Sequence, residues 1–440
     1  MSHKIFSTFQ EAESFLFNSL PFFQRQGPAA YKADIGNISA LLAYAGNPHL
    51  APIKFIHIAG TNGKGSLTHL VASYILSCGF KTGIYTSPHY KNMRERIKIG
   101  NSLIPEYKII EYLNFFIPVL DDIKPSFFEL LCAMAFMYFK DEKVDYAVIE
   151  TGMGGRLDST NIIQPILNVI TNISFDHQAF LGNTLEKIAF EKAGIIKPNT
   201  PVVIGQKIIE TQNIFIQKAE QSNSKLTFAE DNWSCHLSDF DGIISTYRIA
   251  NHTNNTSFNY SSSLHGNYQE QNIQTFMEVC LQLDHYHHIQ WKDSAIKMAL
   301  AQVDKLTYFI GRWHVVQHKP TIILESAHNI DGIQYVVRQL KSMSYDNLYI
   351  IFGTVADKDV GPVLTLLPNT AQYIWTKANI PRAMSEEILY GMAQKVGLGG
   401  VYLPDVATSL QYAMKKATKN DLILVTGSIF IVGDALKILE

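Results

Sequence analysis

Cysteine is scarce in this sequence, and the cysteines that are present form no pattern. The 440 residues contain four, Cys78, Cys132, Cys235 and Cys280, and none of them belongs to a CxxC pair. Zinc knuckles and disulfide frameworks need clustered or regularly spaced cysteines, so neither is expected here. The sequence instead predicts buried free thiols and a reducing, cytoplasmic location.

The sequence also lacks long apolar runs and an excess of charge of either sign. Its longest apolar stretch, FFELLCAMAFMYF, is shorter than the roughly 20 residues that a membrane-spanning helix needs. The first residues, MSHKIFSTFQEAESFLF, have no basic segment leading into an apolar one, as a signal peptide would. With 37 basic against 39 acidic residues, we expect no nucleic acid and no membrane among the partners.

Hydrophobic patterning predicts two α/β domains. A chain of 440 residues exceeds one ordinary core, and from residue 53 onward short β-branched runs alternate with helical patterns. The first domain, residues 1–308, is expected to hold a largely parallel sheet of the P-loop ATPase type, with loops or exposed hairpins at 221–262. The second, residues 309–440, is expected to be a smaller Rossmann-like α/β domain. The predicted strands are IKFIHIA, DYAVIE, LNVITNI and PVVIG in the first domain and TIILE, LYIIFG, QYIW and DLILVT in the second.

A glycine-rich loop, GTNGKGS at residues 60–66, follows the first predicted strand and precedes the helical pattern SLTHLVASYILSCGF. Its spacing differs from the common G-x-x-x-x-G-K-[ST] loop, but the strand-loop-helix context is the one that phosphate sites use. Glycines let backbone N–H groups face phosphate oxygens, the helix N-terminus adds positive potential, Lys64 supplies a cation, and Ser66 offers a hydroxyl to Mg²⁺. The alternative is a glycine turn that only joins strand to helix.

Further polar residues lie beyond predicted strands of the same sheet. Glu150 ends the strand DYAVIE, and His177 follows LNVITNI, with Lys192 on a predicted helix after it. Ligands of open α/β sheets collect at the carboxyl ends of the strands, so Glu150 and His177 are candidate metal ligands. The alternatives are an ordinary acid at a strand end and a surface histidine.

Six motifs, taken in order, resemble folylpolyglutamate synthases of the ATP-dependent Mur ligase superfamily, including their bifunctional dihydrofolate synthase form. They are HIAGTNGKGS, TSPHY, ETGMGGRLDSTN, DHQAFLGNTLEKIAFEKAGI, GRW and AHN, and the likeness runs from about residue 31 to the C-terminus. The resemblance implies a monomeric enzyme that uses ATP to join L-glutamate to the glutamyl carboxylate of reduced folates through an acyl phosphate. It also implies dihydropteroate as a second acceptor.

The same resemblance assigns roles to individual residues. It implies that Lys64, His177 and Lys192 are catalytic, with Lys192 carried as a carbamate, whose oxygens suit Mg²⁺ better than an ammonium group does. The residues implied to bind ATP are Gly60, Thr61, Asn62, Gly63, Lys64, Gly65, Ser66, Asn272, Arg312 and Glu325. The implied ligands of two magnesium ions are Ser66, Ser87, Glu150, His177 and the Lys192 carbamate. The implied substrate contacts are Phe127 and Phe128 with the segment AAYKADIGNI for the pteridine, and His328 and Ser428 for glutamate.

Some of these assignments compete with other interpretations. Phe127 and Phe128 either stack on a flat ring or pack in the core. Glu325-Ser326 precedes AHN where the family usually has aspartate and a small residue, and Met153 replaces a usual leucine. The longer acid motivates one alternative function, a non-catalytic ATP-binding regulator on the same fold. The other is a Mur-type peptidoglycan-precursor ligase, which resembles a plan with a nucleotide-sugar domain ahead of the loop, whereas 59 residues precede the loop here.

Overall fold

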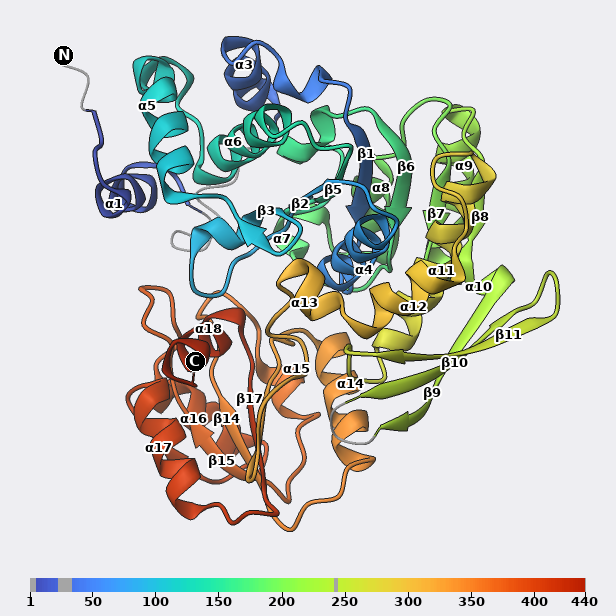
Figure 1. The fold of residues 1–440 in the computed structure, drawn as a ribbon. Coiled ribbons are helices and arrows are strands. Elements are labelled where there is room, and N and C mark those ends of the chain that lie inside the picture. Colours follow the sequence, from blue (N-terminus) through green and yellow to red (C-terminus); the bar gives the residue numbers. More distant parts are fainter. Residues whose placement is uncertain (1–4, 23–33, 241–243, 440) are drawn as a thin grey trace.

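The computed structural model describes residues 5–22, 34–240 and 244–439, and its largest sheet has eight strands (Figure 1). The strand order is β4-β3-β2-β5-β1-β6-β7-β8. Neighbours from β2 to β8 pair in parallel, and β3 and β4 add an antiparallel edge. The expected largely parallel sheet is therefore confirmed. The strands are β1 (Lys54–Ala59), β2 (Thr82–Tyr85), β3 (Ile97–Ile99), β4 (Ser102–Leu103), β5 (Tyr146–Glu150), β6 (Pro165–Ile170), β7 (Val202–Ile204) and β8 (Leu226–Phe228).

Helices cover both faces of this sheet, because alternate residues of its strands are apolar on opposite sides. Helices α1, α3, α5 and α6 lie on one side and α4, α11 and α12 on the other (Figure 1). Phe55 of β1 packs in the first core, and Ile56 and Ile58 pack in the second. A third core lies between β6, β7, α8 and α9. The helices are α1 (Phe9–Ser19), α3 (Gly36–Tyr44), α4 (Lys64–Ser77), α5 (Glu106–Ile123), α6 (Phe127–Asp141), α7 (Gln178–Leu181), α8 (Leu185–Ala193), α9 (Ile209–Gln221), α11 (Gln269–His285), α12 (Asp293–Ala301) and α13 (Val303–Thr307), with 3-10 turns η2 (Pro48–Leu50), η3 (Met93–Arg96) and η4 (Ser159–Ile162).

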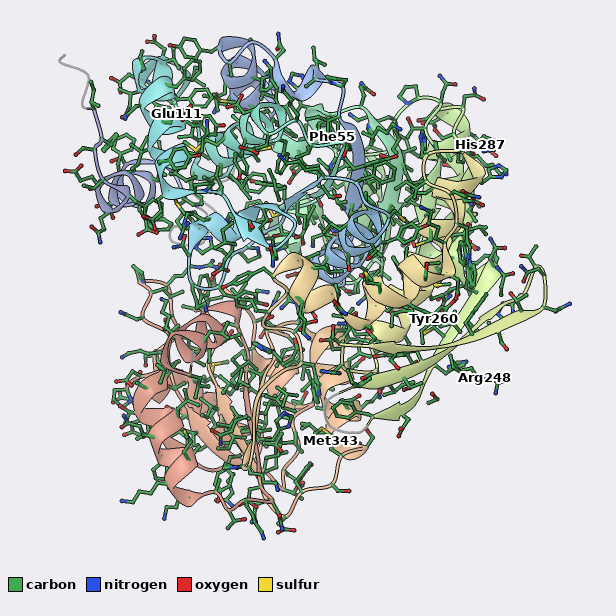
Figure 2. The ribbon with its side chains drawn as sticks, in the orientation of Figure 1. Phe55, Glu111, Arg248, Tyr260, His287 and Met343 are labelled. Carbon is green, nitrogen blue, oxygen red and sulfur yellow. The ribbon has the colours of Figure 1, made fainter. Side chains whose placement is uncertain are left out.

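The segment expected to form loops or hairpins, residues 221–262, folds mainly as a small antiparallel sheet at the edge of the molecule (Figure 1). After α10 (Ala229–Asn232) come β9 (Trp233–Phe240), β10 (Ser245–Asn251) and β11 (Thr256–Ser262). Along β10 the side chains of Tyr247 and Ile249 are buried, and the intervening Arg248 extends outward (Figure 2). The expected exposed hairpins are thus present from residue 233 onward, whereas β8 and α10 precede them.

A second, six-stranded sheet follows along the chain, in the order β12-β13-β17-β14-β15-β16. Its neighbours are parallel except for β12 and β13. Ile323 and Leu424 pack in a core on one face, Ile322 and Ile423 in a core on the other, so this domain too is covered on both sides. Its elements are β12 (His314–His318), β13 (Thr321–Leu324), α14 (Ile330–Lys341), β14 (Leu348–Phe352), α15 (Gly361–Leu364), β15 (Gln372–Trp375), α16 (Glu386–Lys395), β16 (Val401–Tyr402), α17 (Val406–Lys416), β17 (Leu422–Thr426) and α18 (Ile429–Leu439).

Within the described ranges, none of the helices combines the length and the apolar character that spanning a bilayer requires.

Candidate active site

The glycine-rich loop lies between β1 and α4, and its shape depends on the absence of side chains at two positions. Gly60 and Gly63 have φ angles of 146° and 81°. A Cβ at Gly60 would lie 1.8 Å from Thr171 Oγ1, and a Cβ at Gly63 would lie 2.2 Å from Asn272 Oδ1. Helix α4 then begins at Lys64. The loop therefore has the close approaches and the helix N-terminus that a phosphate site uses.

A polar cavity of about 170 Å³ lies over this loop, between the two large sheets. The first domain contributes the loop residues 61–66 with Ser87, Glu150, His177 and Asn272. The second domain contributes Arg312, Glu325, His328 and Tyr335. Most of the residues implied to bind ATP or magnesium are therefore brought together in one place.

The loop also touches the second domain directly through Asn62. The Asn62 amide donates to Asp331 Oδ2 at 2.9 Å and accepts from Asn329 Nδ2 at 3.0 Å. Asn329 caps α14, accepting from the Gly332 N–H. The phosphate loop is thus bonded to the first turn of a helix of the other domain.

Glu150 lies at the carboxyl end of β5, under the loop. It is 4% exposed, and its Oε2 accepts a hydrogen bond of 3.0 Å from the Ser87 N–H. Burial raises the pKa of the carboxyl, whereas the positive charge of Lys64 opposes that rise. Among the described residues Oε1 accepts no hydrogen bond, so one carboxylate oxygen is left to bind a cation.

His177 belongs to a charged cluster that joins the two domains around Asp176. Asp176 Oδ2 lies 3.7 Å from His177 Nε2 and 3.6 Å from His328 Nε2, and Oδ1 lies 3.4 Å from Lys358 Nζ. Burial disfavours the Asp176 carboxylate, but the neighbouring imidazoles of His328 and His177 and the charge of Lys358 outweigh this effect and hold its pKa well below the usual value. Burial lowers the pKa of His177 to about 4. At neutral pH Asp176 is ionised and His177 is neutral.

Lys192 does not line the polar cavity but lies behind the loop. It is on α8, 3% exposed, and its Nζ donates to the Gly60 carbonyl at 2.7 Å. Burial, with the nearby charge of Lys64, lowers the pKa of this amine well below its ordinary value. A lowered pKa favours the neutral amine, which is the nucleophilic form.

Glu325 is held by donors of the protein. Its carboxylate is 3% exposed and accepts from the Trp313 N–H at 2.8 Å, the Tyr268 hydroxyl at 2.9 Å and the Ala327 N–H at 3.0 Å. Tyr268 directly precedes α11 of the first domain, so this acid connects the domains beside Arg312. The longer side chain is thus fully accommodated.

An aromatic cavity of about 240 Å³ adjoins the polar one. Phe22, Phe127 and Phe128 line it from the first domain, and Lys358, Arg382, Ser428 and Phe430 line it from the second. Phe127 is fully buried and packs on Phe22 with a ring distance of 4.1 Å, whereas Phe128 is partly exposed. Residues 29–33 of the segment AAYKADIGNI lie outside the described residues. Both cavities share a wall formed by Ser87, Pro88, Gly152, His177 and His328.

Comparison with known proteins identifies the family. Residues 58–279 match the Mur ligase middle domain, and residues 311–429 match the Mur ligase glutamate ligase domain. A probable dihydrofolate synthetase of Schizosaccharomyces pombe is 31% identical over 424 residues, which are 91% of this chain and 96% of the relative. This chain belongs to the dihydrofolate and folylpolyglutamate synthase family of Mur ligases.

Members of this family differ in length but share the fold. A probable bifunctional folylpolyglutamate synthase/dihydropteroate synthase of Haloferax volcanii is 30% identical over 97% of this chain, which spans only 50% of that relative. Folylpolyglutamate synthase of Mycobacterium tuberculosis, with ADP and AMPPCP, superimposes with a TM-score of 0.83 at 28% identity, covering 98% of each chain. The fold of two α/β domains predicted from the sequence is that of this family.

Sequence reasoning missed several residues that line the cavities or form contacts across the domain boundary. Lys358 follows β14, at the carboxyl edge of the second sheet, and Arg382 lies beyond β15, where ligand contacts collect in open α/β sheets. Their positions beyond the ends of predicted strands could have marked both residues as candidates. Tyr268 and Tyr90 gave no signal, because their partners Glu325 and Ser326 are in the other domain.

Proposed function

We propose that this protein is an ATP-dependent ligase that joins L-glutamate to the carboxylate of a reduced folate, with dihydropteroate as a second acceptor. The observation that carries the proposal is the wall shared by the two cavities, where His177 and His328 flank Asp176. A nucleotide over the loop and a flat acceptor in the aromatic cavity would approach this wall from opposite sides. The ADP and AMPPCP complexes of the Mycobacterium tuberculosis relative support the nucleotide assignment.

The reaction must activate a carboxylate, which is a poor electrophile toward an amine. Transfer of the γ-phosphoryl group of ATP to the acceptor carboxylate gives an acyl phosphate, the glutamate amine attacks its acyl carbon, and phosphate leaves. Such transfer depends mainly on positioning and on cations that stabilise developing charge. We assign that role to Lys64 on the loop and to Arg312 from the opposite domain.

Glutamate would bind on the second-domain side of the shared wall. Its two carboxylates need cations or hydroxyl donors, and His328, Ser428, Lys358 and Arg382 all line the aromatic cavity there. The acceptor and glutamate are then held by different domains, and their contacts bring the reacting groups together. We accordingly propose residues 1–308 as the ATP- and folate-binding domain and residues 309–440 as the glutamate-binding domain.

The side chains at the loop offer the kinds of donor atom that bind divalent cations. Among the described residues no group of three or more His, Cys, Asp and Glu side chains forms a metal site, but Mg²⁺ usually takes one or two protein carboxylates together with water and phosphate oxygens. Glu150 offers the free Oε1, Ser66 and Ser87 offer hydroxyls, and His177 is neutral. Two magnesium ions held there would neutralise phosphate charge.

We also propose that Lys192 is carbamylated. The neutral Nζ attacks the carbon of CO₂, an N–C bond forms, one proton leaves the nitrogen, and the product is an anionic carbamate. Two observations support the proposal: burial lowers the pKa of Lys192 and so favours the neutral amine, and the 2.7 Å bond to the Gly60 carbonyl places Nζ at the loop. Its oxygens would add hard ligands for magnesium.

Incorporation of radiolabelled L-glutamate with MgATP tests the function, with tetrahydrofolate and dihydropteroate supplied in separate reactions. We expect labelled product from both acceptors and one ADP for each glutamate joined. Nucleotide binding without incorporation into either acceptor would support the non-catalytic regulator instead. Labelling of a peptidoglycan precursor but of neither pterin would support the other alternative.

Replacing Glu325 with alanine is expected to raise the Michaelis constant for ATP or glutamate severalfold or more. The change leaves two backbone N–H groups and the Tyr268 hydroxyl without their acceptor and removes the negative charge beside Arg312. Glu325→Asp keeps the carboxylate that the family usually has, and its activity should equal or exceed the parent's. Steady-state kinetics with each of the three substrates varied in turn is the measurement. Parent-like constants in Glu325→Ala would make this acid a bystander.

A further inference from the structure

A buried lysine outside both cavities begins a chain of hydrogen bonds. Lys98 on β3 is 2% exposed, and its Nζ lies 3.1 Å from Nε2 of His69 on α4. Nδ1 of the same imidazole lies 2.7 Å from the Thr307 hydroxyl. His69 and Thr307 are themselves 5% and 0% exposed, so water does not replace these bonds. The chain runs from the first sheet, through the helix of the phosphate loop, to the end of α13.

The direction of these bonds follows from the protons available. The Thr307 hydroxyl donates its one proton to the Val303 carbonyl at 2.5 Å, so His69 Nδ1 must carry a proton and donate it to Thr307. Nε2 is then the unprotonated nitrogen, and it accepts from Lys98. Burial and the charges of Lys98 and Arg312 hold the pKa of His69 well below its usual value, which agrees with a neutral ring.

Thr307 is the last residue before the segment that connects the two domains. This connector, residues 308–313, contains left-handed backbone at Tyr308 (φ 54°), Gly311 (φ 73°) and Trp313 (φ 45°). His69 holds it a second time, since its ring packs edge-on against Phe309 at 5.0 Å. Arg312, which lines the polar cavity, belongs to the same segment. One imidazole thus joins the helix of the phosphate loop to the residues that deliver Arg312.

Packing alone gives no reason for an amine at this position. Desolvation lowers the pKa of Lys98 to about 7, and the carboxylates of Glu95 and Glu150, which act in the opposite direction, do not restore its ordinary value. A buried methionine of similar length would avoid that cost. A residue that costs stability is often part of a functional arrangement.

We propose that Lys98, His69 and Thr307 are positioning residues that fix the connector against α4 and so hold Arg312 at the polar cavity. The proposal relies on the proposed function only in taking Arg312 as a nucleotide contact. None of the three residues lines either cavity, so their effect on the nucleotide is indirect.

Thr307→Val and Lys98→Met test the proposal in the full-length chain. The dissociation constant for MgADP, measured by calorimetry, should rise about threefold to tenfold, and amide hydrogen exchange in residues 308–313 should accelerate. Thr307→Ser keeps the hydroxyl and should restore both values. Ser73→Ala is the matched control, because it removes another buried hydroxyl bond of α4, at 3.0 Å to the Ala299 carbonyl, which does not lead to the connector.

The pH dependence of stability separates positioning from ordinary packing. The titratable and charged groups around Lys98 are His69, Glu95 and Glu150, and Arg312 lies beyond the His69 imidazole. Between pH 7 and 10.5 the unfolded chain keeps the Lys98 proton that the folded chain has lost, so the stability of the parent relative to Lys98→Met should rise with pH there. Below pH 7 the difference should be constant. Near neutral pH, Lys98→Met should be at least as stable as the parent while binding MgADP more weakly.

The outcomes are distinct. Parent-like MgADP affinity and parent-like connector exchange in both Thr307→Val and Lys98→Met would overturn the proposal, as would equal effects in Ser73→Ala. If the parent itself binds no MgADP, the proposed function fails. Hydrogen exchange in residues 308–313 still decides whether Lys98, His69 and Thr307 hold the connector. If Thr307→Val does not fold, Lys98→Met and Thr307→Ser provide the comparison.

Discussion

Glutamate ligation should fall by about a hundredfold to a thousandfold when Lys64 is replaced with alanine. The Lys64 amine donates to the Gly60 and Thr61 carbonyls at 3.1 Å each, at the rim of the polar cavity and at the first turn of α4. Its removal takes away the cation that we propose stabilises the transferred phosphoryl group. The Gly60 carbonyl keeps its 2.7 Å bond from Lys192 and Thr61 lines the cavity, so the fold should persist.

Turnover with saturating substrates, together with a thermal unfolding curve, is the measurement for Lys64→Ala. Lys81→Ala is a suitable control, because Lys81 forms an exposed ion pair with Glu142 at the far end of the helix that begins with Lys64. The control should match the parent in both measurements. A folded Lys64→Ala protein with near-parent turnover would remove the phosphate role of the loop.

Lys192→Ala should lose most of its activity, and small carboxylates such as formate or acetate should restore part of it. The reason is that alanine leaves a buried space where a carbamate would supply anionic oxygens, and a free carboxylate can enter that space. With ¹³C-labelled bicarbonate, the parent should show a carbamate resonance that is missing from the variant. This spectroscopic readout does not depend on ligase activity.

Lys197→Ala provides the comparison for Lys192. Lys197 also donates to a carbonyl, that of Asn161 at 2.7 Å, and burial likewise lowers its pKa. Its loss should reduce stability without any rescue by carboxylates. The carbamate proposal fails if the parent has no ¹³C resonance and a folded Lys192→Ala protein is insensitive to carboxylates.

Much of the fold was predictable because buried parallel strands leave short apolar runs in the sequence. IKFIHIA, DYAVIE and PVVIG each contain a strand of the first sheet, and all four runs predicted for the second domain contain strands. The strand predicted at LNVITNI, residues 167–173, extends too far, because β6 ends at Ile170. Thr171 and Asn172 instead bond the phosphate loop, through the Asn62 carbonyl at 2.6 Å and the Asn62 N–H at 2.8 Å.

Other elements left no readable pattern. The short strands β3, β4 and β16 have three, two and two residues, which is too few to show a period. The hairpins of β9 to β11 have no continuous apolar run, since their exposed positions carry polar residues such as Ser257, Asn259 and Ser261. For these segments pairing with a neighbouring strand, rather than local propensity, decides the structure.

The candidate site was predictable where each residue lies next to its own strand or loop. Glu150, His177 and the loop could be grouped because the carboxyl ends of parallel strands meet at one edge. The relative placement of two domains has no such local signal. The contacts of Asp176 with Lys358 and of Tyr268 with Glu325 therefore appeared only in the structure.

The hydrogen bonds between the two domains join residues that are very far apart in the chain. Asn62 and Asp331 are separated by 269 positions, Tyr90 and Ser326 by 236, and Asp176 and Lys358 by 182. Contacts of such separation form late, because the entropy lost in closing a long loop opposes them until the intervening segments are already compact. Each sheet can assemble within its own domain before that time. A newly synthesised chain should therefore acquire its helices and sheets first, and the ability to hold nucleotide last.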